Sequence, residues 1–171
     1  KPDLILLWHS GTATAMRARA QALGIPVFLS EPRTFEDVAT TIERLGVLTD
    51  NVKTAQIKAN EVRHEASKLA YRYAKKSPVS VFYQVWPRPL MTLNGQHFIS
   101  HIIRLCGGEN IFSKSKISVP IVDIEAVVTA NPEVILTTKS NQHPPLDFST
   151  WQHLPQMTAT QNGAFVALDP D

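Results

Sequence analysis

The sequence is poor in the residues and motifs that catalysis requires. It has one cysteine, Cys106, so neither an internal disulfide nor a cysteine-held metal cluster is expected. It contains no nucleophile elbow, phosphate-binding loop or zinc-protease motif. Cys106 stands among apolar residues at a predicted helix end, which favours burial as a small hydrophobe. We therefore expect no enzyme.

Long apolar runs and basic clusters are also missing. No apolar stretch is long enough to span a bilayer as a helix. The 17 basic residues are scattered and nearly balanced by 15 acidic ones, which argues against a nucleic-acid partner. The sequence opens on Lys1-Pro-Asp without a methionine and stops at Asp169-Pro-Asp171. We expect a piece of a longer protein, with both ends missing.

What is present is an apolar segment after a predicted buried strand, Val79–Gln84. The residues that crowd into it are Trp86, Pro87, Arg88, Pro89, Leu90 and Met91. Loops that follow buried strands are common places for binding residues. Such a loop either packs on its own domain or covers a ligand. The signals around it favour the ligand.

Strands and helices alternate along most of the chain. Strands are expected at 4–7, 26–29, 79–84, 134–138 and 164–168, and helices at 12–23, 34–46, 97–106, 123–130 and 148–153. Gly24 is expected to close the first helix, and Gly46 to end the second, which Thr34 and Asp37 open as a capping box. This alternation predicts an α/β fold with mostly parallel sheets.

A long helix interrupts the alternation between residues 49 and 76. This stretch has no glycine or proline, and apolar residues recur at spacings of three and four. At about 1.5 Å per residue it would extend roughly 40 Å. It fits a coiled-coil arm or a strut between two lobes, and the α/β patterns on both sides favour the strut. The predicted parts are a first lobe (1–48), a connecting helix (49–77) and a second lobe (78–171).

Two short sequences echo each other across this helix. Lys1-Pro-Asp-Leu-Ile-Leu6 and Asn131-Pro-Glu-Val-Ile-Leu136 share a proline, an acid and three aliphatic residues in the same order. In each, the proline ends what precedes it and a buried strand begins. The echo predicts two lobes of similar build.

Two tryptophans stand at comparable places. Trp8 closes the first predicted strand and Trp86 follows the strand after the long helix. Each offers a flat apolar face to a large planar ligand. Arg88, between two prolines, offers a restricted donor fork to carboxylate, amide or phosphate groups. His97 and His101 are four residues apart, but without a third ligand nearby we expect no metal site.

Five motifs in order resemble a known family. They are Lys1-Pro-Asp-Leu-Ile-Leu6, Leu23-Gly-Ile-Pro-Val-Phe28, Leu105-Cys-Gly-Gly-Glu-Asn-Ile-Phe112, Asn131-Pro-Glu-Val-Ile-Leu136 and Asn162-Gly-Ala-Phe-Val-Ala-Leu-Asp169. The pattern is similar to class III periplasmic binding proteins, whose two α/β lobes are joined by one long helix. These proteins serve importers of vitamin B12, ferric siderophores and haem. Val81-Phe-Tyr-Gln84 and the motif that includes Cys106 look most like the vitamin B12-binding branch.

The resemblance implies the substrate-binding component of an ABC importer. Such a protein captures a corrinoid in the cleft between its lobes and delivers it to the membrane permease. Cobalamin would be a ligand, with no cofactor, and the protein would be a monomer in the periplasm or lipid-anchored outside the cytoplasmic membrane. The alternative is a receptor for a ferric siderophore or haem, with Tyr83 or His9 as the axial haem ligand. A related metal-cluster enzyme would need more cysteines.

The resemblance also implies site residues. The ligand-binding positions are Trp8, Tyr83, Val85, Trp86, Arg88, Leu90, Met91 and Asp171. Trp86 is offset by one from the family's aromatic residue, and Met91 and Val119 stand where aromatic residues are expected. Glu125 matches the second-lobe glutamate that docks on the transporter, whereas its first-lobe counterpart is the uncharged Thr14.

Overall fold

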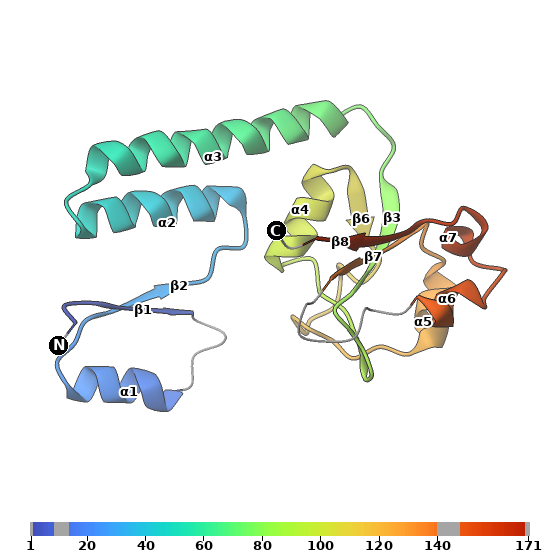
Figure 1. Ribbon diagram of the computed structural model, residues 1–171, viewed down its shortest axis with the longest axis horizontal. Coiled ribbons are helices and arrows are strands. Elements are labelled where there is room, and N and C mark those ends of the chain that lie inside the picture. The colour runs from blue at the N-terminus through green and yellow to red at the C-terminus, as the bar shows by residue number, and fades with distance from the viewer. Residues whose placement is uncertain (1, 9–13, 140–147, 170–171) are drawn as a thin grey trace. The chain divides into compact units, whose positions relative to one another are not determined.

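The computed structural model describes residues 2–8, 14–139 and 148–169. The chain divides into two compact units, Lys1–Glu65 and Ala66–Asp171. The long helix α3 (Val52–Tyr73) gives its first part to one unit and its last part to the other (Figure 1). Both units combine parallel strands with helices, so the predicted α/β fold is confirmed.

The first unit begins with a parallel strand–helix–strand arrangement. Strands β1 (Ile5–Trp8) and β2 (Val27–Ser30) pair in parallel on either side of helix α1 (Thr14–Ala22) in the sequence. After α1 the backbone turns at Gly24, whose φ of 61° lies in the left-handed region that a side chain disfavours. The predicted glycine closure of this helix is confirmed.

Helix α2 (Phe35–Leu48) starts as expected and ends later than expected. Thr34 caps it, and the side chains of Thr34 and Asp37 form the predicted capping box. The prediction that Gly46 ends the helix is wrong, because Gly46 lies within it. A Cβ at Gly46 would stand 2.2 Å from the Cβ of Ala55 on α3. The glycine therefore serves close packing of α2 on α3.

Helix α3 is shorter than the sequence suggested. Its 22 residues correspond to about 33 Å, because Thr49–Asn51 form the turn that joins it to α2 and the helix ends at Tyr73. The predicted apolar stripe is its packed side, on which Ala55 and Ala59 are buried. Farther along, Arg63 bridges back to both Glu36 and Glu43 of α2, at 2.7 and 2.6 Å. These contacts make α2 and α3 an antiparallel pair.

The second unit is built on a four-stranded parallel sheet in the order β6-β3-β7-β8. Strands β3 (Val79–Gln84) and β7 (Val134–Thr138) have the predicted bounds, and β8 (Phe165–Leu168) starts one residue late. Strand β6 (Gly108–Asn110) was not predicted. Its three residues carry no apolar pattern, and pairing with β3 defines it. The helix α7 (Thr158–Gln161), a single turn, was also missed.

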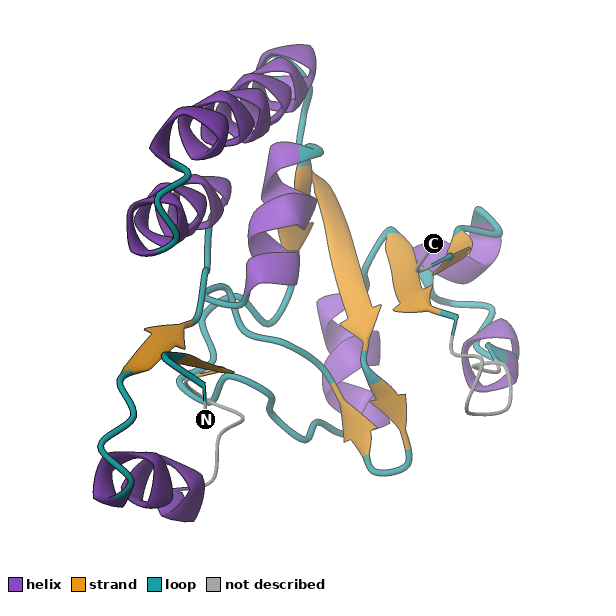
Figure 2. Cartoon of the chain, turned by 60° about the vertical axis from the view of Figure 1, so that its left-hand side comes forward, coloured by secondary structure: helices purple, strands orange, loops and turns teal. Residues whose placement is uncertain are grey.

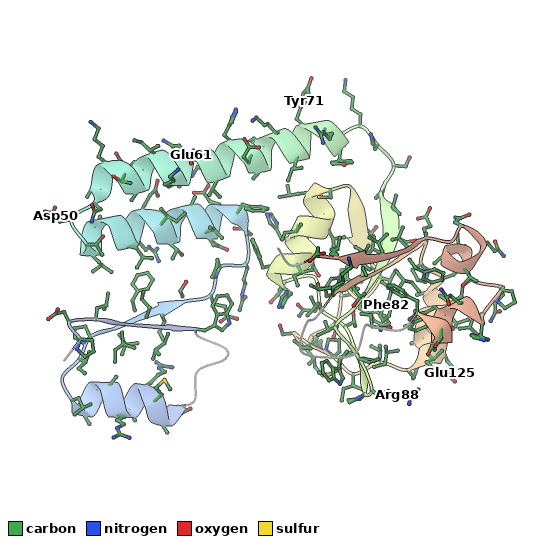
Figure 3. The ribbon with its side chains drawn as sticks, in the orientation of Figure 1. Asp50, Glu61, Tyr71, Phe82, Arg88 and Glu125 are labelled. Atoms are coloured by element: carbon green, nitrogen blue, oxygen red, sulfur yellow. The ribbon has the colours of Figure 1, made fainter. Side chains whose placement is uncertain are left out.

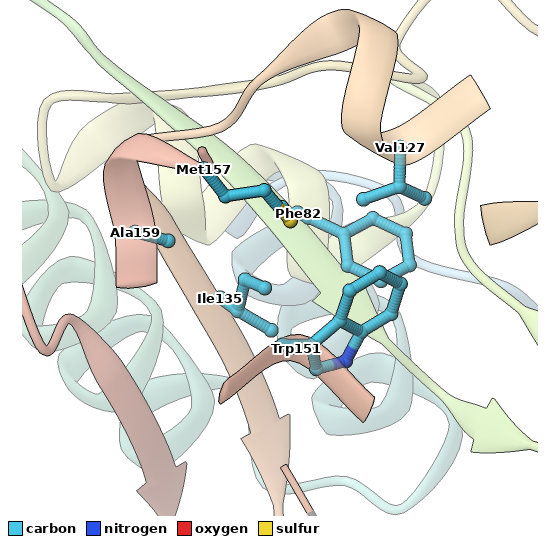
Figure 4. Close-up of a cluster of buried hydrophobic side chains, with 6 residues drawn as sticks. All are labelled: Phe82, Val127, Ile135, Trp151, Met157 and Ala159. Carbon is cyan, nitrogen blue, oxygen red and sulfur yellow. The ribbon is translucent and has the colours of Figure 1, made fainter. Parts of the chain in front are cut away.

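Alternating residues of β3 bury both faces of this sheet. Phe82 points to one face, where helices α5 (Ile124–Ala130), α6 (Ser149–Gln152) and α7 cover it. The cluster there comprises Phe82, Val127, Ile135, Trp151, Met157 and Ala159 (Figure 4). Val81 and Tyr83 point to the other face and pack with Leu93 and with Ile103 of α4 (Phe98–Leu105).

Cys106 corrects one expectation. It is the C-cap of α4 and is exposed, not buried. The apolar positions of α4 that are buried or partly buried against the sheet lie earlier in the helix, at Ile99 and Ile103. A cysteine just past the last helical turn points away from that packed face.

The close contact at Gly46 gives a first testable prediction. Gly46→Ala is expected to lower the free energy of unfolding by about 1–3 kcal/mol, because the added Cβ overlaps that of Ala55. Adding Ala55→Gly removes the overlapping atom. In chemical denaturation the double variant should therefore lose less stability than the sum of the two single variants. Strict additivity would contradict the contact.

The Arg63 bridge gives a second prediction, on pH dependence. Hydrogen bonds from Arg63 hold the pKa of Glu36 and that of Glu43 below the usual glutamate range. Their contribution to stability is therefore complete above about pH 4.3 and is lost as the pH falls through the lowered values. Wild-type protein should lose more unfolding free energy on acidification than Arg63→Gln.

A matched control is Lys58→Gln. Lys58 pairs with Glu61 on the same helix at 2.8 Å, but both side chains are more than half exposed. Exposed pairs contribute little to stability. Denaturation should be measured at several acidic pH values. The unfolding free energy of Lys58→Gln should fall with decreasing pH as steeply as that of the wild type. An equally weak pH dependence in Lys58→Gln and Arg63→Gln would refute the bridge.

Candidate ligand-binding site

The apolar segment after β3 is a small hairpin. Strands β4 (Trp86–Pro87) and β5 (Leu90–Met91) pair antiparallel around Arg88 and Pro89, beyond the carboxyl end of β3 (Figure 2). The Val85 amide donates to the Met91 carbonyl at 2.9 Å, which closes the base of the hairpin. The sequence predicted a loop here, since prolines disfavour ladder pairing and each strand has two residues.

Trp86 presents its ring from the first strand of the hairpin. Its side chain is 37% exposed, and its indole nitrogen donates to the Arg88 carbonyl at 3.0 Å. The bond ties the ring to the turn and uses the indole's one conventional donor. The ring itself is the apolar part of this side chain, suited to contact with a flat ligand.

Arg88 lies at the turn of the hairpin and is exposed (Figure 3). Among residues 2–8, 14–139 and 148–169, none forms an ion pair with its guanidinium. The prolines on both sides restrict its backbone. The turn therefore holds a cation with donors available to an external acceptor.

The remaining predicted residues of this region are more enclosed. Leu90 packs against the cluster around Phe82, and Val85 packs against the opposite cluster with Val119. They anchor the hairpin on both faces of the sheet, and Met91 is half-buried beside them. Trp86 and Arg88 are thus exposed at the outer part of the hairpin, and the more enclosed Val85 and Leu90 hold its base.

Tyr83 is enclosed in this structure. Its side chain is 5% exposed, and its hydroxyl hydrogen-bonds to Thr138 on the adjacent strand. The sequence-based expectation that Tyr83 meets a ligand's polar edge, or serves as an axial ligand of haem, finds no support in this placement. Side chains alternate between the two faces of β3, and both faces are covered, so the Tyr83 ring lies in the core. The predicted buried strand already implied this enclosure.

Trp8 occupies the matching place in the first unit. It is the last residue of β1 and its side chain is 53% exposed. Like Trp86, it stands where a parallel strand ends, at the edge where binding residues of α/β sheets collect. Two other predicted residues, His9 and Asp171, lie outside the described residues.

Gln84 is a notable residue that the sequence analysis missed. It ends β3 directly before the hairpin and is 2% exposed. Its Oε1 accepts from the indole nitrogen of Trp151 at 2.8 Å, while its Nε2 has no hydrogen-bond partner among the described residues. A buried amide donor without a partner is costly. The available signal was a glutamine at the end of an otherwise largely apolar strand.

Neither a metal site nor a membrane-spanning helix is found in the described residues. His97 caps α4, with its Nδ1 accepting from the Ile99 amide at 3.2 Å. Within the part of the chain that the structure describes, no three His, Cys, Asp or Glu residues are grouped so that they could hold a metal ion. No helix in that same part is both long and apolar enough to cross a membrane.

The two predicted docking positions lie near helix N-termini. Glu125 is the second residue of α5 and is exposed, while Asp123 caps that helix by accepting from the Ala126 amide at 2.7 Å (Figure 3). Thr14 is the first residue of α1 and is also exposed. Both are on the surface of their own units, and only Glu125 carries a charge.

Comparison with known proteins decides the family. Residues 1–171 match the family described as "Periplasmic binding protein". The chain belongs to the periplasmic binding protein family. Its parallel sheets and covering helices are the fold of that family's solved members.

Several relatives in the periplasmic binding protein family are named for vitamin B12. The chain is 34% identical over 174 residues to the vitamin B12-binding protein of Vibrio cholerae, covering all of this chain and 61% of the relative. It is 36% identical over 138 residues to that of Yersinia pestis, covering 81% and 49%. The chain thus spans about three fifths of the length of the first relative.

Solved structures agree on the fold. The periplasmic vitamin B12-binding protein BtuF of Vibrio cholerae matches with a TM-score of 0.83 at 33% identity, over 98% of this chain and 65% of that one. The haem-binding protein HutB of the same species matches with a TM-score of 0.81 at 19% identity, over 98% and 68%. The second likeness concerns the fold alone.

The enclosure of Tyr83 gives a third prediction. Tyr83→Phe removes the hydroxyl bonded to Thr138 and should lower the unfolding free energy by about 0.5–1.5 kcal/mol. Tyr71→Phe is the matched control, since Tyr71 is 87% exposed on α3 (Figure 3). Urea denaturation should separate the two variants. Equal stability in both would mean that the Tyr83 hydroxyl is not held in the core.

Proposed function

We propose that this chain belongs to the substrate-binding component of an ABC importer that captures a corrinoid, vitamin B12 (cobalamin), and delivers it to a membrane permease. The observation that carries this is the exposed Trp86 on a braced hairpin, in a chain whose whole length aligns with a vitamin B12-binding protein. The same relatives support a periplasmic location, free or lipid-anchored, and we propose a monomer.

The chemistry of the hairpin suits such a ligand. A corrinoid has a broad ring with amide groups at its rim. The Trp86 ring supplies a flat apolar surface for contact, and its own donor is already used. Arg88 offers guanidinium donors to rim carbonyls from a backbone restricted by two prolines.

The half-buried neighbours explain why the hairpin needs little rearrangement. Leu90 and Val85 pack on opposite clusters of the sheet, and Val122 donates its amide to the Leu90 carbonyl at 2.9 Å. Met91 pairs with Trp86 across the hairpin. A surface held in place before binding loses less conformational entropy when the ligand arrives.

Further contacts are proposed from position in the sequence. Trp8 ends a strand and is exposed, and we propose it as a ligand contact on the resemblance to the family. Asp171 is proposed as a ligand contact and Glu125 as a permease contact on the resemblance to the family. Of the two residues named as axial haem ligands, Tyr83 is 5% exposed and hydrogen-bonded to Thr138, and this enclosure supports the proposal of a corrinoid.

The test is calorimetric titration of the full-length protein with cyanocobalamin, haemin and a ferric siderophore in turn. The proposal expects saturable binding of cyanocobalamin that is tighter than that of the other two. If haemin or the siderophore binds and cyanocobalamin does not, the protein is a receptor for that ligand class and not for a corrinoid.

Variants of the tryptophans give a fourth prediction. Trp86→Ala and Trp8→Ala should each weaken cyanocobalamin binding about tenfold or more, because each removes an exposed aromatic contact. Tyr71→Ala, which removes a still more exposed aromatic ring from α3, should leave the dissociation constant unchanged. If all three variants bind alike, the hairpin is not the binding surface.

A further inference from the structure

A cavity in the second unit lies apart from the hairpin. It has a volume of about 370 Å³ and is lined by residues of the edge strand β6, the end of α3 and α4. Cavities of this size hold small ligands. None of the residues Trp86–Met91 lines it. The lining residues are Tyr73, Lys76, Pro78, Gly95, Ser100, Arg104, Gly107, Gly108, Glu109, Asn110 and Ser113.

Two cations reach this cavity, and each is positioned by a neutral partner. The Lys76 ammonium lies 5.2 Å from the centre of the Tyr73 ring, and Arg104 donates from Nη2 to the Gly95 carbonyl at 3.1 Å. Neither forms an ion pair with any residue in the described ranges. Their charges are therefore oriented but not neutralised.

The one acidic residue among the described lining residues, Glu109, leaves a local excess of one positive charge. An excess of this sign in a concave site attracts an anion. Glu109 also sets a limit, because its carboxylate repels a highly charged ligand. The site therefore favours a small anion of low charge.

A buried hydroxyl completes the set of donors. Ser100 is 3% exposed, and its Oγ accepts from Nδ2 of Asn110 at 2.9 Å. Asn110 is fixed in this orientation, since Nδ2 also donates to the Leu93 carbonyl and Oδ1 accepts from the Phe112 amide. The Ser100 oxygen is thus used as an acceptor, and its O–H remains to donate from the cavity wall.

We propose that this cavity binds a small molecule through a phosphate or carboxylate group held by Arg104, Lys76 and Ser100. Guanidinium, ammonium and hydroxyl donors form charge-assisted hydrogen bonds to such oxyanions. The site is separate from the proposed corrinoid contacts. It gives the second unit a ligand of a different chemical class.

The test follows backbone amide signals of the full-length protein by nuclear magnetic resonance at constant ionic strength. Inorganic phosphate and acetate are titrated separately. Saturable shifts are expected at Gly95, Gly107, Gly108 and Ser113, which line the cavity. Earlier saturation by phosphate assigns a phosphate group, and earlier saturation by acetate assigns a carboxylate.

Charge-removing variants provide the fifth prediction. Arg104→Gln and Lys76→Gln, both at exposed positions, should each weaken anion binding about tenfold or more while leaving cyanocobalamin affinity unchanged. Lys114→Gln is the matched control, since Lys114 is exposed and does not line the cavity. Thermal melts confirm that each variant is folded.

Two results would overturn the proposal. The first is a linear, unsaturated response to both anions in the wild-type protein. The second is saturable binding that neither Arg104→Gln nor Lys76→Gln weakens more than Lys114→Gln does.

Discussion

Burial of β3 on both faces is the constraint on which the second unit depends. Phe82 anchors one face, against which α5, α6 and α7 pack. Val81 and Tyr83 anchor the other face, against which α4 packs. Such a strand cannot shift by one residue without exchanging its two faces. Its carboxyl end is therefore fixed, and so is the hairpin that follows. The position of Trp86 and Arg88 is a consequence of how Phe82 packs.

The same constraint explains what the sequence could and could not predict. The bounds of β3 and β7 follow from short segments rich in β-branched, aliphatic and aromatic residues, which are typical of buried strands. The hairpin was hidden because Pro87 and Pro89 disfavour ladders, and β6 because its three residues carry no apolar pattern. Gly46 misled for a related reason: in isolation glycine predicts a helix end, whereas contact with Ala55 requires it inside the helix. Local signals failed where packing with a distant segment decided the outcome.

The candidate site shows this division again. Its location came from sequence, because a tryptophan after a buried strand is visible without coordinates. The roles within it required the structure: Trp86 and Arg88 are exposed, Val85 and Leu90 brace them, and Tyr83 is enclosed. The burial of Gln84, with its Oε1 bonded to Trp151 and its Nε2 without a partner among the described residues, required the structure. Membership in the periplasmic binding protein family then connects the exposed hairpin residues with ligand binding.

The central claim is that the hairpin itself contacts a corrinoid. Hydrogen–deuterium exchange of the full-length protein with and without cyanocobalamin tests it directly. Slower exchange is expected at the amides of Trp86, Arg88, Leu90 and Met91, with exchange in α2 unchanged. Cyanocobalamin binding that leaves exchange in the hairpin unaltered would contradict it.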